Sequence, residues 1–214
     1  MNLRFDEKEA ARALNCYKIE LNAKPDLMAV AINSDKTLCL IVDMINGFCK
    51  TGALASPRLA AVTAPVRAVL EALPNAKKVF VRDCHAKNSM EFKWFPPHCH
   101  TGKESAVISE LAGISGTDVA KNSTNGFFAL HSKIPDLNTF TNIVIVGVCT
   151  DICVMQLSLT LRAYLNESNA PTNIITFTDA LETYDSPVHS AELSNLFALK
   201  FMEQAGIQVF KNIL

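Results

Sequence analysis

Strand-length apolar runs recur along this chain with amphipathic stretches between them, and this alternation constrains the fold most strongly. Each run is apolar almost without interruption, which is typical of strands that are covered on both faces. The runs span residues 37–43, 78–83, 142–148, 173–179 and 207–210. Strands that alternate with helices build parallel sheets with helices on both sides. The sequence therefore predicts an α/β fold in three layers, an α/β/α sandwich.

The stretches between the runs have helical periodicity. Residues 58–73 place leucines and valines on one face, and residues 151–165 do the same. Ser186 followed by Pro187 predicts an N-cap and a first helical residue, for a helix that ends at Gly206. With these helices, the predicted sheet is mostly parallel and Rossmann-like.

Composition bounds the domain organisation and the class of partner. Residues 37–214 are predicted to form a single domain, and residues 1–36 an N-terminal arm with one short helix and an extended piece. A net charge of −1 without a Lys/Arg cluster argues against nucleic acid or an anionic membrane as partner, and favours a small molecule. The charged start of the chain, the strand-sized apolar runs and seven scattered cysteines predict a cytoplasmic protein with reduced thiols.

Polar side chains end several predicted strands, where ligands bind in folds of this class. Asp43, Asp83, Lys121 and Asp179 stand at such ends, and Cys153 is expected in the first turn of the next helix. A helix start favours a thiolate, Asp43 can take the thiol proton, and Lys121 can balance the charge. Taken singly, each residue also fits a structural interpretation: a loop cap, a surface lysine and a buried thiol.

A second cluster lies in the aperiodic loop that follows the run at 78–83. Asp83 and His85 face the same way in an extended chain, and the loop adds Glu91 and His98. Oxygen and imidazole donors suit Zn²⁺, Mn²⁺ or Fe²⁺. Two alternatives stay open. In one, the histidines line a pocket without binding an ion. The other is a structural zinc site made of Cys84, His85, Cys99 and His100.

Three segments resemble the isochorismatase-like cysteine hydrolases: LIVDMINGFC (40–49), VAKNSTNGF (119–127) and GVCTDICV (147–154). The resemblance covers roughly residues 37–210 in the family's order. It implies a catalytic triad of Asp43 as general acid/base, Lys121 as electrostatic partner and Cys153 as nucleophile. It also implies a cis peptide before Cys149, and an oxyanion hole made by the amides of Cys149 and Cys153.

The loop narrows the resemblance to the nicotinamidases, which act in pyridine nucleotide salvage. In these enzymes the positions of Asp83, His85, Glu91 and His98 hold the metal ion, although many members have histidine where Glu91 stands. The expected cofactor is one divalent ion, Zn²⁺ before Mn²⁺ or Fe²⁺. The resemblance also implies a homo-oligomer, which is common in the family.

The same resemblance implies the substrate and its pocket. Phe48 and Phe95 match the aromatic residues between which the nicotinamide ring stacks, so that the carboxamide lies over Cys153. The expected reaction is hydrolysis of nicotinamide to nicotinate and ammonia through a thioester. Two alternatives remain: a cysteine hydrolase of another small amide, such as a carbamoyl, biuret or ureido compound, and a catalytically silent binding protein on the same scaffold.

Overall fold

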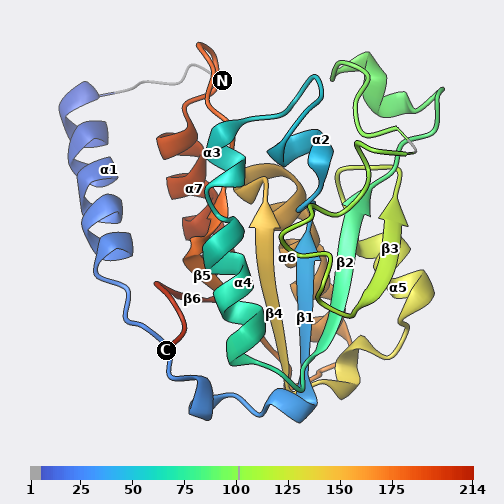
Figure 1. Cartoon of the computed structure of the whole chain (residues 1–214). Helices are drawn as coiled ribbons and strands as arrows, with labels where there is room; N and C mark the ends of the chain where they lie inside the picture. The colour runs from blue at the N-terminus through green and yellow to red at the C-terminus, as the bar shows by residue number, and fades with distance from the viewer. Residues whose placement is uncertain (1–5, 101) are drawn as a thin grey trace.

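Six parallel strands form one sheet in the order β3-β2-β1-β4-β5-β6 (Figure 1). The computed structural model describes residues 6–100 and 102–214. The strands are β1 (Thr37–Val42), β2 (Lys77–Asp83), β3 (Thr117–Lys121), β4 (Asn142–Val148), β5 (Asn173–Glu182) and β6 (Gln208–Phe210). The chain begins at the centre, builds one half of the sheet, and crosses back beside β1 to build the other. The predicted Rossmann-like α/β fold is confirmed.

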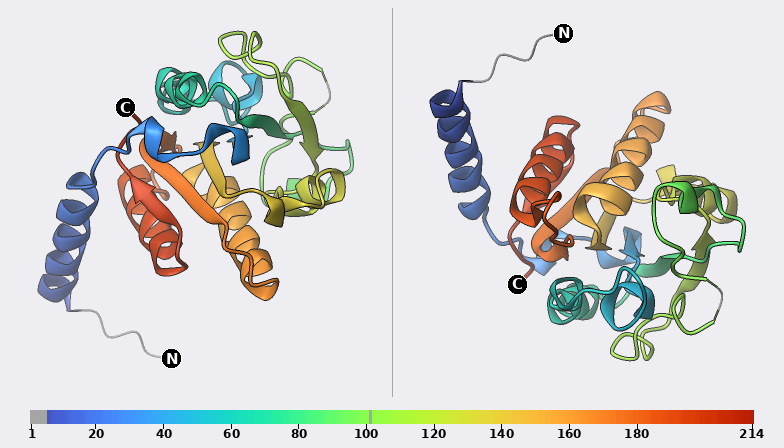
Figure 2. Two further views of the ribbon diagram at one scale, coloured as in Figure 1. Left: turned by 90° about the horizontal axis from the view of Figure 1, so that it is seen from below. Right: turned by 90° about the horizontal axis from the view of Figure 1, so that it is seen from above.

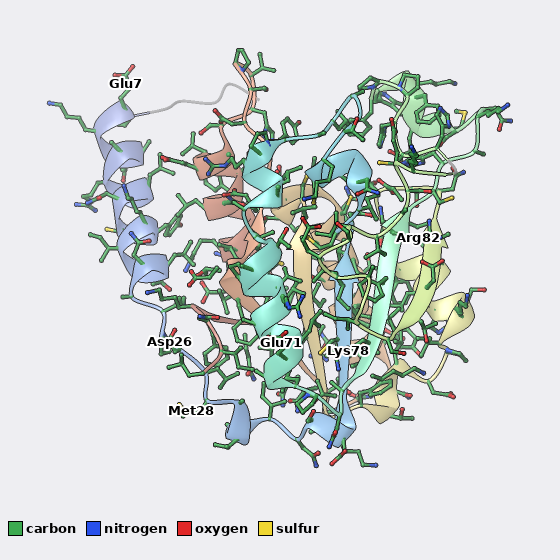
Figure 3. All side chains as sticks on the ribbon, in the orientation of Figure 1. Glu7, Asp26, Met28, Glu71, Lys78 and Arg82 are labelled. Atoms are coloured by element: carbon green, nitrogen blue, oxygen red, sulfur yellow. The ribbon has the colours of Figure 1, made fainter. Side chains whose placement is uncertain are left out.

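Helices cover both faces of the sheet, as the two end-on views show (Figure 2). On one side lie α3 (Pro57–Ala60) and α4 (Thr63–Ala72), and on the other α5 (Phe127–Lys133), α6 (Met155–Glu167) and α7 (Ala191–Gln204). Side chains fill the space between these layers (Figure 3). β1 and β4 are buried along their whole length, which explains their unbroken apolar sequences.

Two predicted helices differ from those observed. The stretch 58–73 is divided into α3 and α4, because Pro65 has no N–H to donate to the carbonyl of Ala61 in a continuous helix. The last helix begins at Ala191 and not at Pro187. Ser186 and His189 exchange main-chain hydrogen bonds of 2.9 and 3.1 Å, which closes a turn, and the helix is then capped by Ser190.

β5 is longer than predicted and irregular. Its pairing with β4 shifts register between Ile145 and Gly147, so the strand continues to Glu182. Asp179 therefore lies within the strand and not at its carboxyl end. Its amide donates to the carbonyl of Lys211 at 3.1 Å, away from the other strand-end residues. The prediction that Asp179 ends the fifth strand was wrong because a bulge cannot be seen in the apolar pattern.

The N-terminal arm packs beside α7 (Figures 1 and 2). Its helix α1 spans Glu7–Asn22, longer than expected, and Lys200 on α7 binds Glu20 at 2.9 Å. Residues 1–5 of the predicted arm lie outside the described residues. In the described part of the chain no helix has both the length and the apolar character needed to cross a membrane. All seven cysteines lie in that part and none forms a disulfide.

Candidate active site

The carboxyl ends of β1, β2 and β3 bring two carboxylates and an ammonium together. Asp43 directly follows β1 with a φ of +52°, a conformation that Asp tolerates better than most residues. Its Oδ1 accepts a hydrogen bond of 2.7 Å from the amide of Asp83. Lys121 Nζ lies 2.9 Å from Asp43 Oδ2 and also contacts Asp83 Oδ1. Because the three side chains are almost fully buried, each charge depends on the other two.

Cys153 completes this cluster. Its Sγ lies 3.6 Å from Lys121 Nζ, and one donor atom each of Asp43, Asp83 and Cys153 lie within 4.8 Å of one another. The structure thus brings together the three residues predicted as a triad. We expected Cys153 in the first turn of an α-helix. It lies instead in a π-helical turn, η5 (Thr150–Val154), just before α6. Such turns are frequent at functional sites.

Burial and charge set the protonation states of the cluster. Burial, followed by the charge of Asp83, raises the pKa of Asp43 to about 6 despite the Lys121 ammonium. Burial would lower the pKa of Lys121, but Asp43 and Asp83 outweigh it and raise that pKa well above its usual value. Burial also raises the pKa of the Cys153 thiol, although Lys121 opposes this. The resting cluster therefore holds a thiol beside an unusually basic carboxylate, and not the thiolate expected from a helix start.

The turn that holds Cys153 begins at a cis peptide between Val148 and Cys149, as the family resemblance implies. The carbonyl of Cys149 accepts hydrogen bonds from Ile152 and Val154 at 3.2 and 3.1 Å. Within the described residues, no main-chain hydrogen bond outside the regular elements is donated by the Cys149 amide.

Three of the four predicted metal ligands converge next to the cluster. Asp83 Oδ2 lies 3.4 Å from His85 Nε2 and 3.7 Å from His98 Nε2. Two ligands of one tetrahedral zinc ion at about 2.1 Å lie about 3.4 Å apart, so each of the two distances from Asp83 suits a shared ion. The set whose donor atoms all lie within 4.8 Å of one another is Asp83, His98 and Cys99, so His85 is close to Asp83 but stands apart from that set. His98 Nδ1 donates to the carbonyl of Pro96 at 2.8 Å, and His85 Nδ1 lies 3.4 Å from Ser89 Oγ. Both rings therefore direct Nε2 toward Asp83.

One orphaned atom supports the same interpretation. His85 Nε2 is buried and has no hydrogen-bond partner in the part of the chain that the structure describes. A buried ring nitrogen without a partner costs free energy, and an ion bound between the rings would remove that cost. Burial alone would raise the pKa of Asp83, but Lys121 with His85 and His98 holds it below its usual range. The donor set therefore fits a divalent ion.

The remaining loop residues are placed differently. Glu91 is half-buried on η3 (Met90–Lys93), and its Oε1 accepts a hydrogen bond of 3.1 Å from the Thr124 amide. Of the rival zinc set, Cys99 has a donor atom within 4.8 Å of those of Asp83 and His98. The ring of His100 instead packs against Phe92 at 5.1 Å. The metal-site geometry thus centres on Asp83, with Glu91 bound to a neighbouring loop.

A cavity of about 290 Å³ opens onto Cys153. Phe48 and Phe95, the two predicted aromatic walls, both line it, together with His98 and Asp83. Its other lining residues are Leu54, Leu59, Trp94, Pro96, Thr124, Cys149, Ile152 and Tyr184. Of these residues, Ile152 lies within the motif at 147–154. The position of Tyr184 could not be predicted from the sequence, because it follows the irregular end of β5.

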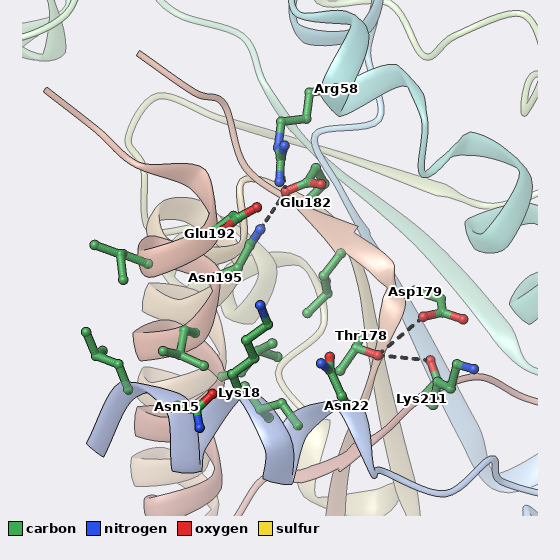
Figure 4. A pocket seen from close by; sticks show the side chains of 16 residues that line it. Asn15, Lys18, Asn22, Arg58, Thr178, Asp179, Glu182, Glu192, Asn195 and Lys211 are labelled. Atoms are coloured by element: carbon green, nitrogen blue, oxygen red, sulfur yellow. Dashed lines mark hydrogen bonds and ion pairs between the residues drawn. The ribbon is translucent and has the colours of Figure 1, made fainter. Parts of the chain in front are cut away.

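A larger groove of about 770 Å³ lies elsewhere, between α1, α7 and the end of β5 (Figure 4). Its labelled side chains include Lys18 on α1, Asn195 on α7, and Glu182, which pairs with Arg58 at 3.2 Å. Asp179, one of the predicted strand-end residues, lines this groove, but none of the predicted triad, oxyanion-hole, metal-ligand or ring-stacking residues does. We therefore assign the chemistry to the smaller cavity, where the buried charges and the thiol meet.

Comparisons with known proteins identify the family and the fold. An isochorismatase domain model matches residues 37–209. Nicotinamidase 1 of Arabidopsis thaliana is 27% identical over 186 residues, which cover 75% of each protein. The N-carbamoylsarcosine amidase structure from Thermoplasma acidophilum superposes with a TM-score of 0.65 at 25% identity, covering 82% of this chain and 95% of the other. A pyrazinamidase of Pyrococcus horikoshii in complex with zinc gives 0.65 at 21%, covering 82% and 99%.

Proposed function

The chain belongs to the isochorismatase domain family, whose relatives are amide hydrolases, and from this premise we propose that it is a metal-dependent nicotinamidase. The reaction would convert nicotinamide and water to nicotinate and ammonia. One observation carries the proposal: the buried Asp43, Lys121 and Cys153 cluster opens into a small cavity with aromatic walls. The proposed substrate ring would lie between Phe48 and Phe95, which both line the cavity, with its carboxamide directed at the thiol.

The charge of the cavity favours a neutral ring over a carbamoylated amino acid. Among its lining residues, all within the described chain, none is lysine or arginine. A carboxylate-bearing substrate needs such a partner when it leaves water. N-carbamoylsarcosine, the substrate named for one structural relative, carries a carboxylate. It is the second candidate and belongs in the same assay.

The metal site is part of the proposal. Asp83, His85 and His98 would hold the ion, and Zn²⁺ is the expected ion, which also occurs in the Pyrococcus horikoshii structure. Glu91, whose Oε1 accepts from the Thr124 amide, remains a candidate for the fourth position. When bound, the ion supplies a Lewis-acidic position for the pyridine nitrogen and so orients the ring. His98 also lies at the cavity wall, 5.8 Å from the Phe48 ring between centroids, which links ion site and ring pocket.

The chain's own residues perform the chemistry. Asp43 takes the Cys153 proton as sulfur attacks the carboxamide carbon, and the amides of Cys149 and Cys153 donate to the oxyanion. Asp43 returns the proton to the leaving nitrogen, so ammonia departs and a thioester remains. Asp43 then takes a proton from water as the water oxygen attacks the thioester carbonyl, and returns that proton to the sulfur when the carbon–sulfur bond breaks. Nicotinic acid leaves and ionises to nicotinate, and the thiol is restored. Lys121 stays cationic and stabilises the Asp43 carboxylate whenever Asp43 is ionised.

Ammonia release from nicotinamide, measured with the metal content of the purified protein, tests the proposal. Cys153→Ala should lower kcat by roughly 10⁴-fold or more, because it removes the nucleophile. Cys49→Ala is the matched control, since Cys49 is also a buried thiol, whose pKa burial raises to about 11, and it does not line the cavity.

Each outcome separates the hypotheses. Release of ammonia from N-carbamoylsarcosine alone would replace nicotinamide as substrate and leave the cysteine mechanism in place. Full activity of Cys153→Ala would refute the nucleophile. No turnover of any small amide would favour a silent binding protein.

A further inference from the structure

The loop between β5 and α7 carries an aromatic residue into the cavity that no motif indicates. Tyr184 is half-buried and lines the cavity together with Cys149 and Cys153. Burial, with Asp151 and Cys149 nearby, raises the pKa of the Tyr184 phenol, so the ring presents a neutral surface. Its position depends on a short loop, because β5 ends two residues earlier at Glu182.

Asp151 ties this loop to the turn that bears the nucleophile. It lies in η5, two residues before Cys153, and its side chain is 16% exposed. Oδ1 accepts a hydrogen bond of 2.5 Å from the hydroxyl of Thr183, the residue before Tyr184. Oδ2 lies 2.7 Å from His189 Nε2, at the far end of the same loop. One carboxylate thus clamps both ends of the segment that carries Tyr184.

His189 holds Tyr184 in two further ways. The two rings stack with centroids 4.0 Å apart and planes inclined by 11°. His189 Nδ1 lies 3.0 Å from the carbonyl of Tyr184, so it donates there while Nε2 faces the carboxylate. The ring plane of Tyr184 is therefore determined by stacking on the His189 ring and by the hydrogen bond from His189 to the Tyr184 carbonyl.

This cluster is not a second catalytic triad. Ser194 Oγ lies 3.1 Å from His189 Nε2, the same nitrogen that faces Asp151. A serine nucleophile needs the carboxylate on the opposite ring nitrogen, which here faces a main-chain carbonyl. The arrangement orients a ring and does not relay a proton.

We propose that Tyr184 is a specificity-determining wall of the amide pocket, and that His189 and Asp151 are positioning residues which act through it. The proposal rests on the pocket of the proposed function and adds a third aromatic wall to Phe48 and Phe95. The clamp joins this wall to the turn with Cys149 and Cys153, so the wall and the sulfur keep a constant separation. Planar aromatic amides should gain more from it than aliphatic ones.

A double-mutant cycle on the metal-loaded enzyme tests this inference. Tyr184→Leu and His189→Ala should each raise the KM for nicotinamide roughly three- to tenfold, the range of an aromatic contact, with kcat within about threefold. Tyr184→Phe should retain the wild-type KM within about threefold, since it keeps the ring. Because His189 acts through Tyr184, the KM of the double variant should not exceed that of the single variant with the higher KM.

The control is another stacked histidine. His131 stacks on Phe127 with centroids 5.5 Å apart and planes inclined by 19°, and neither residue lines the cavity. His131→Ala should leave KM unchanged. If the effects of the two substitutions on KM multiply in the double variant, the inference is overturned, because His189 would then not act through Tyr184. An unchanged KM in Tyr184→Leu would also overturn it, because Tyr184 would then not touch the substrate.

A second readout distinguishes failure of this inference from failure of the proposed function. If the wild-type enzyme does not turn over nicotinamide, the same cycle is measured as the rate at which iodoacetamide alkylates Cys153, followed by peptide mass spectrometry. That rate depends on the wall and not on the substrate. Each single variant should raise it roughly three- to tenfold and the double variant no further, and unchanged or multiplied rates would again overturn the inference.

Discussion

Replacing Lys121 by methionine tests whether the buried ammonium holds the site together. Lys121 Nζ contacts Asp43 and Asp83, and the three side chains are 1%, 0% and 3% exposed. Methionine retains the length of the side chain and removes the charge. The two carboxylates then face each other at the end of the sheet without a counter-charge, in a region from which water is excluded.

The size of the effect follows from this burial. Breaking a buried ion pair by removing one partner costs about 3–5 kcal/mol, because the remaining charge is left uncompensated. Here two carboxylates lose their partner, but Asp43 can take up a proton and relieve part of the repulsion. We therefore expect a loss of about 3 kcal/mol in the free energy of unfolding. This corresponds to a fall in Tm of roughly 6–12 °C for a chain of this size.

The assay is equilibrium unfolding in urea, followed by circular dichroism in EDTA, so that a bound ion cannot replace the missing charge. Lys50→Met is the matched control: Lys50 pairs with Glu110, but these side chains are 43% and 40% exposed. An exposed pair contributes at most about 1 kcal/mol, so the control should unfold nearly as the wild type does. A loss below about 1 kcal/mol in Lys121→Met would refute the reasoning that burial makes this ammonium indispensable.

Two further predictions concern the ion and the sheet. Asp83→Asn should abolish metal retention measured by plasma mass spectrometry after dialysis, whereas His100→Ala should not. Glu91→Gln can still accept from Thr124, so a fall in retention there would identify Glu91 as a ligand, and unchanged retention would remove it from the set. Gly147→Ala should yield no soluble protein, because a Cβ would lie 2.0 Å from the Val42 carbonyl oxygen at a φ of +118°. At Gly102, with a φ of +102°, an added Cβ would meet no atom of the described residues within 4 Å, its chain neighbours apart. Gly102→Ala should therefore remain soluble at a cost of about 1–3 kcal/mol, and equal behaviour of the two variants would refute the role of the close contact.

Much of the framework could be predicted because it depends on local patterns. Unbroken apolar runs indicate strands that are buried on both faces, and their alternation with helices implies a parallel sheet. Asp43, Asp83 and Lys121 could be selected because the carboxyl ends of parallel strands meet at one edge. The family motifs then indicated which of these polar residues to combine with Cys153.

The predicted boundaries of helices and strands were wrong where a distant pairing partner or a single missing atom determines the local structure. Pro65 interrupts a helix whose apolar periodicity continues, because a missing N–H is invisible to hydrophobicity. The bulge in β5 depends on its pairing with β4, so neither the end of the strand nor the place of Tyr184 follows from the local sequence. The start of α7 was decided by the turn that joins Ser186 to His189.

By itself the sequence determined the parallel α/β architecture and the small set of polar residues at its edge, since both follow from where apolar runs stop. Only the tertiary structure decided the strand order that places Lys121 between Asp43 and Asp83. It also decided that burial raises the pKa of both the Cys153 thiol and the Asp43 carboxyl. The physical reason is that charge, solvent exclusion and ring stacking act across space between residues far apart in the chain, and no local pattern records those distances.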